Sequence, residues 1–269
     1  MGEGKLFTVL LKHYRRSRGL SQLDLASAAE ISARHLSFLE TGRAKPSRDM
    51  VLRLAGTLGL GLRDVNGLLV AAGHPEKYAE TALEQVSPPI RAALERMLSA
   101  QEPFPLIVFD GHYEVRMMNA AARRLLRFAM PTWDPHTPLN ILRLCFDPQL
   151  GRSMIENWES VARHLLQRLA RDHLLTGRES LGLLLSQMLA YPDVPQDFRT
   201  IDPNANVDPV FDLHFRVHGA SMRFLTTLTS FDMPRHVLLD ELRIESYFPL
   251  DEETRQLCEQ LARMEDGRA

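Results

Sequence analysis

Residues 21–40 read SQLDLASAAEISARHLSFLE, and the spacing of their polar and apolar positions predicts two short helices. Ser21 is placed to cap the first helix, which carries Leu25 on its inward face, because a serine side chain accepts a hydrogen bond from the free amides of a helix's first turn. Ser32 is placed in the same way before the second helix, with Leu36 inward. Only about three or four residues separate the two helices.

That spacing is typical of a helix-turn-helix, in which the second helix enters the major groove of DNA. Further helices are expected around the pair at residues 5–18, 47–58 and 62–72, each with an apolar stripe of helical period. Five short helices around one small core form the predicted first domain, residues 1–75.

The second helix of the pair would present its outward side chains to the bases. With Leu36 and Leu39 inward, the outward and flanking positions are Ala33, Arg34, Ser37 and Phe38. Arginine pairs with guanine and serine with several bases. Two placements of Phe38 fit the pattern equally: against a thymine methyl, or packed on the following turn. Contacts to the DNA backbone are expected from Gln22, Ser32, Arg43, Lys45 and Ser47.

Arg15 of the helix at 5–18 is predicted to pair with Glu40, which flanks the buried stripe at the end of the second helix of the pair. The alternative is two separately solvated charges, which would contribute almost nothing to stability.

Composition and charge are those of an ordinary globular protein. The 269 residues allow two domains, and 45% of them are hydrophobic. The net charge of −2 hides an asymmetry, because residues 1–75 carry eleven Lys and Arg against six Asp and Glu. A basic head and an acidic body are consistent with a phosphate-binding first domain.

Cysteine usage and hydropathy indicate the compartment. Cys145 and Cys258 match no metal or redox spacing, so we expect free thiols, in keeping with a reducing cytoplasm. No 18-residue apolar span predicts a membrane helix. The protein is therefore expected to be cytoplasmic, without membrane contact.

The remainder of the chain predicts a linker, a domain that mixes strands and helices, and a terminal helix. Residues 76–102 form the linker, with an amphipathic helix that carries Ile90, Leu94, Met97 and Leu98. The next domain covers 103–250, and 251–269 read as a C-terminal helix. The overall fold class is thus α+β.

Two strands, several helices and three strands follow one another in the domain at 103–250. Strands are expected at 106–109 and 113–118, joined at an Asp110-Gly111 hairpin turn, and Asn119 is placed to cap the next helix. The helical region carries a stripe of Trp158, Val161, Ala162, Leu165 and Leu169. The last three strands are expected around 211–217, 222–231 and 242–248. In the last of these, Leu242, Ile244 and Phe248 alternate with Arg243 and Glu245.

The first domain resembles the Cro/phage-repressor type of helix-turn-helix, the xenobiotic-response-element (XRE) family. The matching positions are Ser21-Gln22, Leu25-Ala26, Ile31-Ser32, Leu36, Leu39-Glu40, Gly42-Arg43, Pro46-Ser47, Leu54-Ala55, Leu58 and Ala72-Gly73. One departure is Glu30, in the turn where the family often has glycine. This residue must tolerate a left-handed conformation or a different turn.

The second domain resembles a PAS domain, and more closely the ligand-binding domain of MmyB-like transcription regulators. The segments that carry the resemblance are VFDGHYEVRMMNAAARRLL (108–126), LNILRLCFDPQLGRSMIENW (139–158), FLTTLTSFDMP (224–234) and LDELRIESYFP (239–249). The resemblance implies a five-stranded antiparallel sheet, an apolar pocket and a fatty-acid-like ligand.

Candidate pocket residues are apolar side chains of the expected sheet face and of the helices opposite it, with one threonine: Met117, Leu142, Phe146, Trp158, Phe215, Phe224 and Thr226. Each of them also fits an ordinary core position. A carboxylate ligand would need a donor near the mouth, and Arg143 is the candidate for it.

The residues predict no catalytic constellation. The stretch GTLGLG at 56–61 follows no strand and fails the dinucleotide pattern, and no metal-ligand set or cofactor motif is evident. Three interpretations stay open: a ligand-responsive transcription regulator that binds double-stranded DNA as a homodimer, an enzyme with a regulatory helix-turn-helix, and an antitoxin-like module that binds a protein partner. The first is preferred, and no enzymatic activity is expected.

Overall fold

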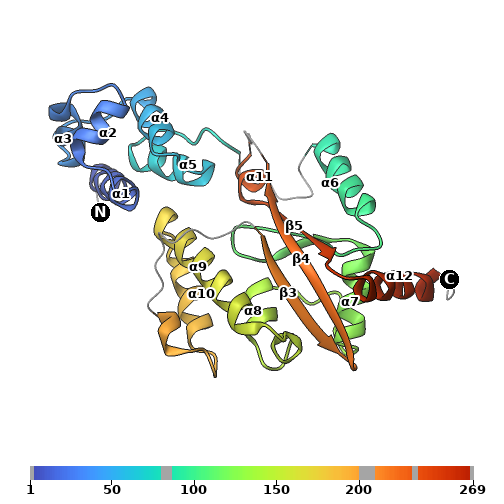
Figure 1. Ribbon diagram of the computed structural model, residues 1–269. Coiled ribbons are helices and arrows are strands. Elements are labelled where there is room, and N and C mark those ends of the chain that lie inside the picture. The colour runs from blue at the N-terminus through green and yellow to red at the C-terminus, as the bar shows by residue number, and fades with distance from the viewer. Residues whose placement is uncertain (1–2, 80–86, 200–209, 232–235, 267–269) are drawn as a thin grey trace. The chain divides into compact units, whose positions relative to one another are not determined.

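The computed structural model describes residues 3–79, 87–199, 210–231 and 236–266 (Figure 1). Part of the predicted linker, 80–86, lies outside the described residues. The chain divides into two units. The first comprises Met1–Thr81, Arg171–Glu179 and Asp232–Asp240, and the second comprises Ala82–Ala170, Ser180–Phe231 and Glu241–Ala269.

Five short helices form the N-terminal part of the first unit, as the sequence pattern predicts. They are α1 (Glu3–Ser17), α2 (Gln22–Ala28), α3 (Ala33–Glu40), α4 (Arg48–Thr57) and α5 (Leu62–Ala71). Ser21 caps α2: its Oγ accepts from the Asp24 amide at 3.1 Å, and its own amide donates to Asp24 Oδ2 at 2.9 Å. Ser32 caps α3 through the His35 amide at 3.1 Å. The predicted helix starts are therefore confirmed.

The turn between α2 and α3 takes the left-handed conformation, one of the two outcomes expected for Glu30. Glu30 has a φ of 54°, and the next amide, Ile31 N, donates to the carbonyl of Ala26 at 2.9 Å. This turn directs Leu36 and Leu39 of α3 inward, where both side chains are fully buried.

One antiparallel sheet forms the centre of the second unit (Figure 1). Its strands are β1 (Leu106–Phe109), β2 (Val115–Met118), β3 (Val210–Val217), β4 (Ala220–Ser230) and β5 (Arg243–Pro249), in the spatial order β2-β1-β5-β4-β3. Two strands thus precede the helices and three follow them. This confirms the predicted order and the PAS-like α+β class.

The connection between β1 and β2 is longer than the predicted Asp110-Gly111 turn. Asp110 Oδ1 accepts hydrogen bonds from the amides of His112 at 2.8 Å and Glu114 at 3.1 Å, which rounds the chain over five residues. The positive φ of 65° falls on Tyr113. The sequence pattern missed this because an Asp side chain, and not a glycine, organises the loop.

Helices α7, α8, α9 and α10 lie between β2 and β3 in the chain, and α6 and α12 flank the domain in sequence. The helices and 3₁₀ turns after residue 87 are α6 (Pro88–Ala100), α7 (Ala120–Ala129), α8 (Ile141–Phe146), η2 (Arg152–Met154), α9 (Trp158–Thr176), α10 (Glu179–Leu189), η3 (Gln196–Arg199), α11 (Val237–Glu241) and α12 (Glu252–Asp266). All members of the predicted stripe on α9 are buried against the sheet and its neighbouring helices.

Asn119 joins the sheet to α7. Its Oδ1 accepts from the Ala122 amide at 2.9 Å, which is the predicted helix cap, and from the Leu106 amide at 3.1 Å. Its Nδ2 donates to the Phe104 carbonyl at 2.8 Å. One buried side chain therefore fixes the start of α7 beside the start of β1.

Candidate DNA-reading face and candidate ligand cavity

The outer side of α3 carries an arginine that lies over an aromatic ring. Arg34 is exposed, and its guanidinium carbon lies 5.4 Å from the centre of the Phe38 ring, one helical turn away. Phe38 is half-buried, so its ring is neither fully outward nor part of the core. Ala33 is exposed and Ser37 is half-buried beside them. The four predicted base-reading positions thus share one side of α3.

Exposed basic residues follow α3 in the chain. Arg43 and Lys45 are exposed in the turn after α3, and Arg48 is exposed at the start of α4. Ser32 and Ser47 are exposed as well, and each hydroxyl oxygen accepts the capping bond of its helix. A hydroxyl that accepts in this way keeps its O–H as a donor for a phosphate oxygen. Four of the five residues predicted to contact the DNA backbone, all except Gln22, are therefore exposed.

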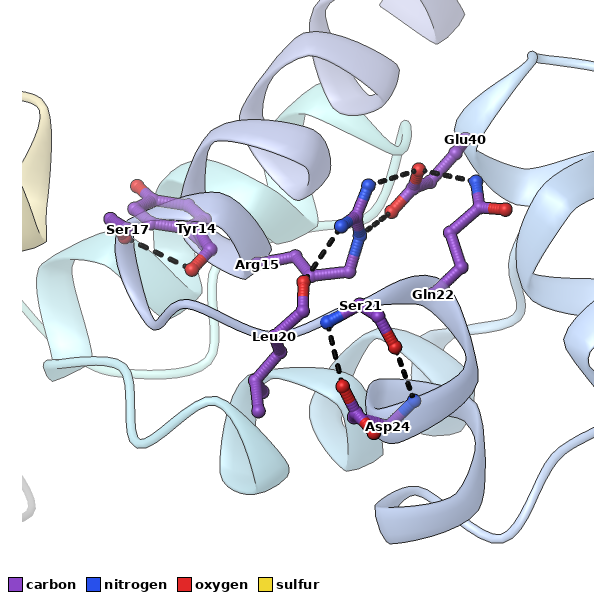
Figure 2. A network of polar contacts seen from close by, with 8 residues as sticks. All are labelled: Tyr14, Arg15, Ser17, Leu20, Ser21, Gln22, Asp24 and Glu40. Atoms are coloured by element: carbon purple, nitrogen blue, oxygen red, sulfur yellow. Dashed lines mark hydrogen bonds and ion pairs between the residues drawn. The ribbon is translucent and has the colours of Figure 1, made fainter.

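The predicted Arg15–Glu40 pair is confirmed, and Figure 2 shows that Gln22 completes it. Arg15 Nε donates to Glu40 Oε1 at 2.6 Å, and Arg15 Nη2 donates to Oε2 at 3.0 Å. Gln22 Nε2 donates to the same Oε2 at 2.8 Å. The Glu40 side chain is 1% exposed, so this pair is not a solvated surface pair. The side chain of Gln22, predicted to bind phosphate, is tied to Glu40.

The charge of Glu40 is stabilised by these bonds. Burial acts to raise the pKa of its carboxyl, but the hydrogen bonds from Arg15 and Gln22, together with the nearby positive charges of Arg15 and Lys12, outweigh burial, so the pKa lies below its usual value. Arg15 also donates to the Leu20 carbonyl at 2.8 Å. The network therefore ties α1 to the start of α2 and to the end of α3, and so orients the outer side of α3.

The second unit contains an apolar cavity between the sheet and its helices. The space in it that the centre of a water-sized probe can reach is about 90 Å³. Every strand contributes to its wall, and α7, α8, η2 and α9 close it from the other side. Its lining residues are Pro105, Ile107, Val115, Ala122, Leu125, Leu126, Ala129, Met130, Leu139, Ile141, Leu144, Cys145, Gly151, Met154, Ile155, Val161, Leu165, Phe211, Leu213, Phe215, Val217, Met222, Glu245 and Tyr247.

Three of the lining side chains carry polar or titratable groups. Glu245 and Tyr247 are two residues apart on β5, which places them on the same face of the sheet. The Tyr247 hydroxyl donates to Glu245 Oε1 at 2.8 Å. Glu245 is 2% exposed, and its Oε2 has no hydrogen-bond partner among the described residues. Cys145 of α8 is the third, and it is a free thiol, as is Cys258.

Burial favours the uncharged forms of all three groups. It raises the pKa of Glu245, against the lowering effect of the Arg168 charge and of the Tyr247 bond. It also raises the pKa of Tyr247 well above its usual value, and the neighbouring Glu245 adds to that rise. Burial raises the pKa of the Cys145 thiol to about 12.

Comparison with known protein families assigns both units. The family model of the MmyB-like transcription regulator ligand binding domain matches residues 90–261, which is more than half of the chain. The chain belongs to this family. A helix-turn-helix domain model matches residues 6–67, around α2 and α3.

Individual relatives of this MmyB-like chain are named as regulators. It is 44% identical over 55 residues to the HTH-type transcriptional regulator DdrOP3 of Deinococcus deserti, a match that covers 20% of this chain and 43% of the relative. It is 30% identical over 107 residues to the uncharacterized HTH-type transcriptional regulator Mb0023 of Mycobacterium bovis, covering 40% of this chain and 42% of the relative. The chain therefore spans less than half of the length of these relatives.

A solved structure also aligns with the MmyB-like chain. It is titled as an RNA-binding Light-Oxygen-Voltage receptor, is 13% identical, and covers 97% of this chain and 64% of that chain at a TM-score of 0.29. A likeness at that level supports no conclusion about fold or function.

One of the eight ligand-contact residues predicted for the MmyB-like domain, Phe215, lines the cavity. Six of the others lie outside the cavity lining. Leu142, Phe146 and Trp158 are part of the core around α8 and α9, and Phe224 packs near α12. Thr226 donates to the Phe211 carbonyl, and Met117 lines a separate surface hollow. Arg143 is exposed and lies with Asp147 and Tyr191 at another surface depression. The donor expected at the mouth is thus on a different surface.

The sequence did not predict the polar residues of the cavity wall, Glu245, Tyr247 and Cys145. The pattern of β5 groups Glu245 with Arg243, opposite the apolar Leu242 and Ile244, as if it faced solvent. In the structure the successive residues Ile244 and Glu245, which lie on opposite faces of β5, are both buried, and the cavity with its helices covers the face that carries Glu245. A charged residue in the middle of a strand expected at 242–248, followed two positions later by a tyrosine, was the only available signal.

Within the described residues, no group of three or more His, Cys, Asp and Glu side chains is arranged to hold a metal ion. None of the helices described is both long and apolar enough to cross a membrane.

Proposed function

We propose that this protein is a DNA-binding transcription regulator that responds to an apolar, fatty-acid-like small molecule. The observation that carries the proposal is the apolar cavity in a domain of a ligand-binding family, in a chain that also bears a helix-turn-helix. No cofactor is needed for this activity. The relatives' names support regulation, and the ligand class rests on the lining of the cavity.

Support for DNA binding comes from α3 and the turn that follows it. Arg34 has the chemistry to bond guanine in the major groove, and Arg43 and Lys45 have the charge to bind phosphates. One helix reads only a few base pairs, so we expect a homodimer on a near-palindromic site, with half-sites about one helical turn apart.

Support for a ligand response comes from the composition of the cavity wall. A ligand changes DNA affinity only if it binds the DNA-competent and DNA-incompetent states with different affinities. Helix α6 is the element we expect to carry that difference, because it lies in the chain between the helix-turn-helix and β1. Its Leu94 and Leu98 are buried while Met97 is 39% exposed.

The test is the DNA affinity of the full chain with and without medium- to long-chain alkyl ligands. We expect ligand to change the Kd for cognate DNA by about 5–150-fold, the usual range of allosteric coupling. Ala129→Phe, which fills the cavity from α7, should remove that response and leave DNA binding by the ligand-free protein intact. The matched control is Ala190→Phe, at an exposed position after α10 and outside the cavity lining.

The possible results are distinct. Ligand binding without any change in DNA affinity would contradict the switch. A polypeptide that co-purifies in place of a small molecule would favour the antitoxin-like alternative.

A further inference from the structure

We propose that Glu245 is the residue that selects the polar end group of the ligand, and that it favours an uncharged hydroxyl group over a carboxylate on the same alkyl chain. This inference rests on the proposed function, since it concerns the cavity in the second unit.

The described part of the cavity wall holds a hydrogen-bonding site that is incomplete. Glu245 is buried, and its Oε1 accepts from Tyr247 while its Oε2 has no partner within the described chain. A buried oxygen without a partner has lost its hydrogen bonds to water without replacement, so a ligand that supplies the missing bond recovers this free energy. The rest of the lining is apolar apart from the Cys145 thiol and the tyrosine that already donates to Glu245.

The charged groups of the cavity lining disfavour a negatively charged ligand. The described lining contains no Lys, Arg or His side chain, and the only group in it that becomes an anion at ordinary pH is Glu245. Arg168 of α9 acts on Glu245 through its charge, but it is not part of the lining, and its guanidinium lies over the rings of Tyr113 at 5.0 Å and Phe109 at 5.4 Å. The wall therefore offers a carboxylate ligand no direct ion pair.

A hydroxyl and a carboxylate end group differ in how they pair with the two protonation states of Glu245. If Oε2 is protonated it donates, and if the carboxyl is ionised it accepts. A hydroxyl group accepts or donates, so it pairs with Glu245 in either state. A carboxylate only accepts, so it pairs with the protonated form alone and is repelled by the ionised form. The raised pKa of Glu245 lowers this repulsion without reversing the order.

Burial of the alkyl chain contributes equally to the binding free energy of two ligands of equal chain length. Decan-1-ol and decanoate bury similar alkyl surface, and burial of that surface scales with its area. A difference in their affinity therefore reports the end group. Because decanoate must also lose its hydration on entering the apolar wall, the difference favours the alcohol.

The experiment measures the Kd of decan-1-ol and decanoate by calorimetry, on the full chain freed of bound lipid, at pH 7.5. We expect the wild-type protein to bind decan-1-ol at least about tenfold more tightly. In Glu245→Gln the amide supplies a permanent N–H donor and no charge, so decanoate should gain affinity and the ratio should fall to within about threefold. In Glu245→Leu no hydrogen-bonding group remains at this position, and decan-1-ol should lose about tenfold in affinity.

A matched control separates these effects from general changes of charge. Glu159→Gln, on the exposed first turn of α9, removes the same charge outside the cavity and should leave both affinities unchanged. Glu245→Gln keeps the shape of the side chain and its bond to Tyr247, so it is the variant to interpret if Glu245→Leu does not fold.

Three results would overturn the proposal. Decanoate that binds the wild type as tightly as decan-1-ol contradicts the selection. So does a ratio that is the same in wild type and Glu245→Gln. Failure of every alkyl ligand to bind any variant removes this proposal and the proposed ligand response together. Selective binding of decan-1-ol that leaves DNA affinity unchanged supports the role of Glu245 and contradicts only the switch.

Discussion

Arg34 is exposed on α3, and its guanidinium lies over the half-buried ring of Phe38. The guanidinium over the ring is held by the helix itself, since the two residues are four apart and face the same side. A side chain whose position is set before DNA arrives loses less conformational entropy on binding. The ring therefore acts as a support for the arginine, in addition to any contact that its exposed part makes with a base.

At this scale we predict that Arg34 reads sequence and Lys45 does not. Arg34→Ala should weaken binding to cognate DNA by about 1–3 kcal/mol and flatten the preference at one base pair. Lys45→Ala should weaken cognate and random DNA alike, because phosphates carry no sequence information. Anisotropy titrations against a panel of single-base variants measure both, with the exposed Arg53→Ala on α4 as control. A changed base preference in Lys45→Ala alone would show that α3 is oriented differently.

The sequence predicted individual buried positions correctly where the apolar residues follow a single helical period. Leu36 and Leu39 fixed the inward side of α3 because a short helix has one buried stripe. It failed for Glu245, because burial of this side chain depends on α7, α8 and α9, which come from distant parts of the chain and cover that face of the sheet. The partner bonds of Gln22 were missed for a related reason: a helix start is exposed by default, and only tertiary packing brings Glu40 to it.

Among the elements, α1, α2 and α3 depend on one carboxylate. Glu40 accepts two bonds from Arg15 of α1 and one from Gln22 of α2, all in a site closed to solvent on the Glu40 side. Removal of one partner of such a pair leaves a charge without compensation, which is worse than its absence.

We therefore predict that Glu40→Ala destabilises the helix-turn-helix by about 3–5 kcal/mol, nearer the lower value because Arg15 remains 11% exposed. Hydrogen exchange of α1–α3 amides in the full chain should accelerate accordingly, while amides of the sheet strands keep their protection. Glu76→Ala, at an exposed position after α5, is the matched control and should change neither. Unchanged exchange in α1–α3 would mean that the pair contributes nothing measurable.

Elements were predictable to the extent that their signals are local. Helix starts at Ser21, Ser32 and Asn119 carry their own caps, so their positions followed from the sequence. The loop after β1 did not, because the side chain of Asp110 reorganises it and moves the left-handed residue to Tyr113. The cavity followed only in outline, from the alternation of Leu213, Phe215 and Val217 on β3.

For the whole molecule, we predict salt-sensitive binding to paired half-sites. A dimer that makes about six phosphate contacts should lose roughly 10³-fold in affinity between 50 and 200 mM salt, because each contact releases condensed counterions. Duplexes with one and two half-sites, compared over that range, provide the measurement. Equal affinity for both duplexes would contradict the dimer, and affinity independent of salt would contradict the phosphate contacts.

The strand order of the second unit also has a consequence for biosynthesis. β1 pairs with β5, and the partners Leu106 and Ser246 are 140 positions apart in the chain. At roughly 5–20 residues per second, a ribosome needs roughly 7–28 s to make that stretch. During this interval β1 has emerged with the edge that β5 will cover still open, while α1 to α5 and the core that they share lie within residues 3–71. The nascent sheet, and not the helix-turn-helix, is therefore the part of this protein that most needs chaperones to shield it until β5 is translated.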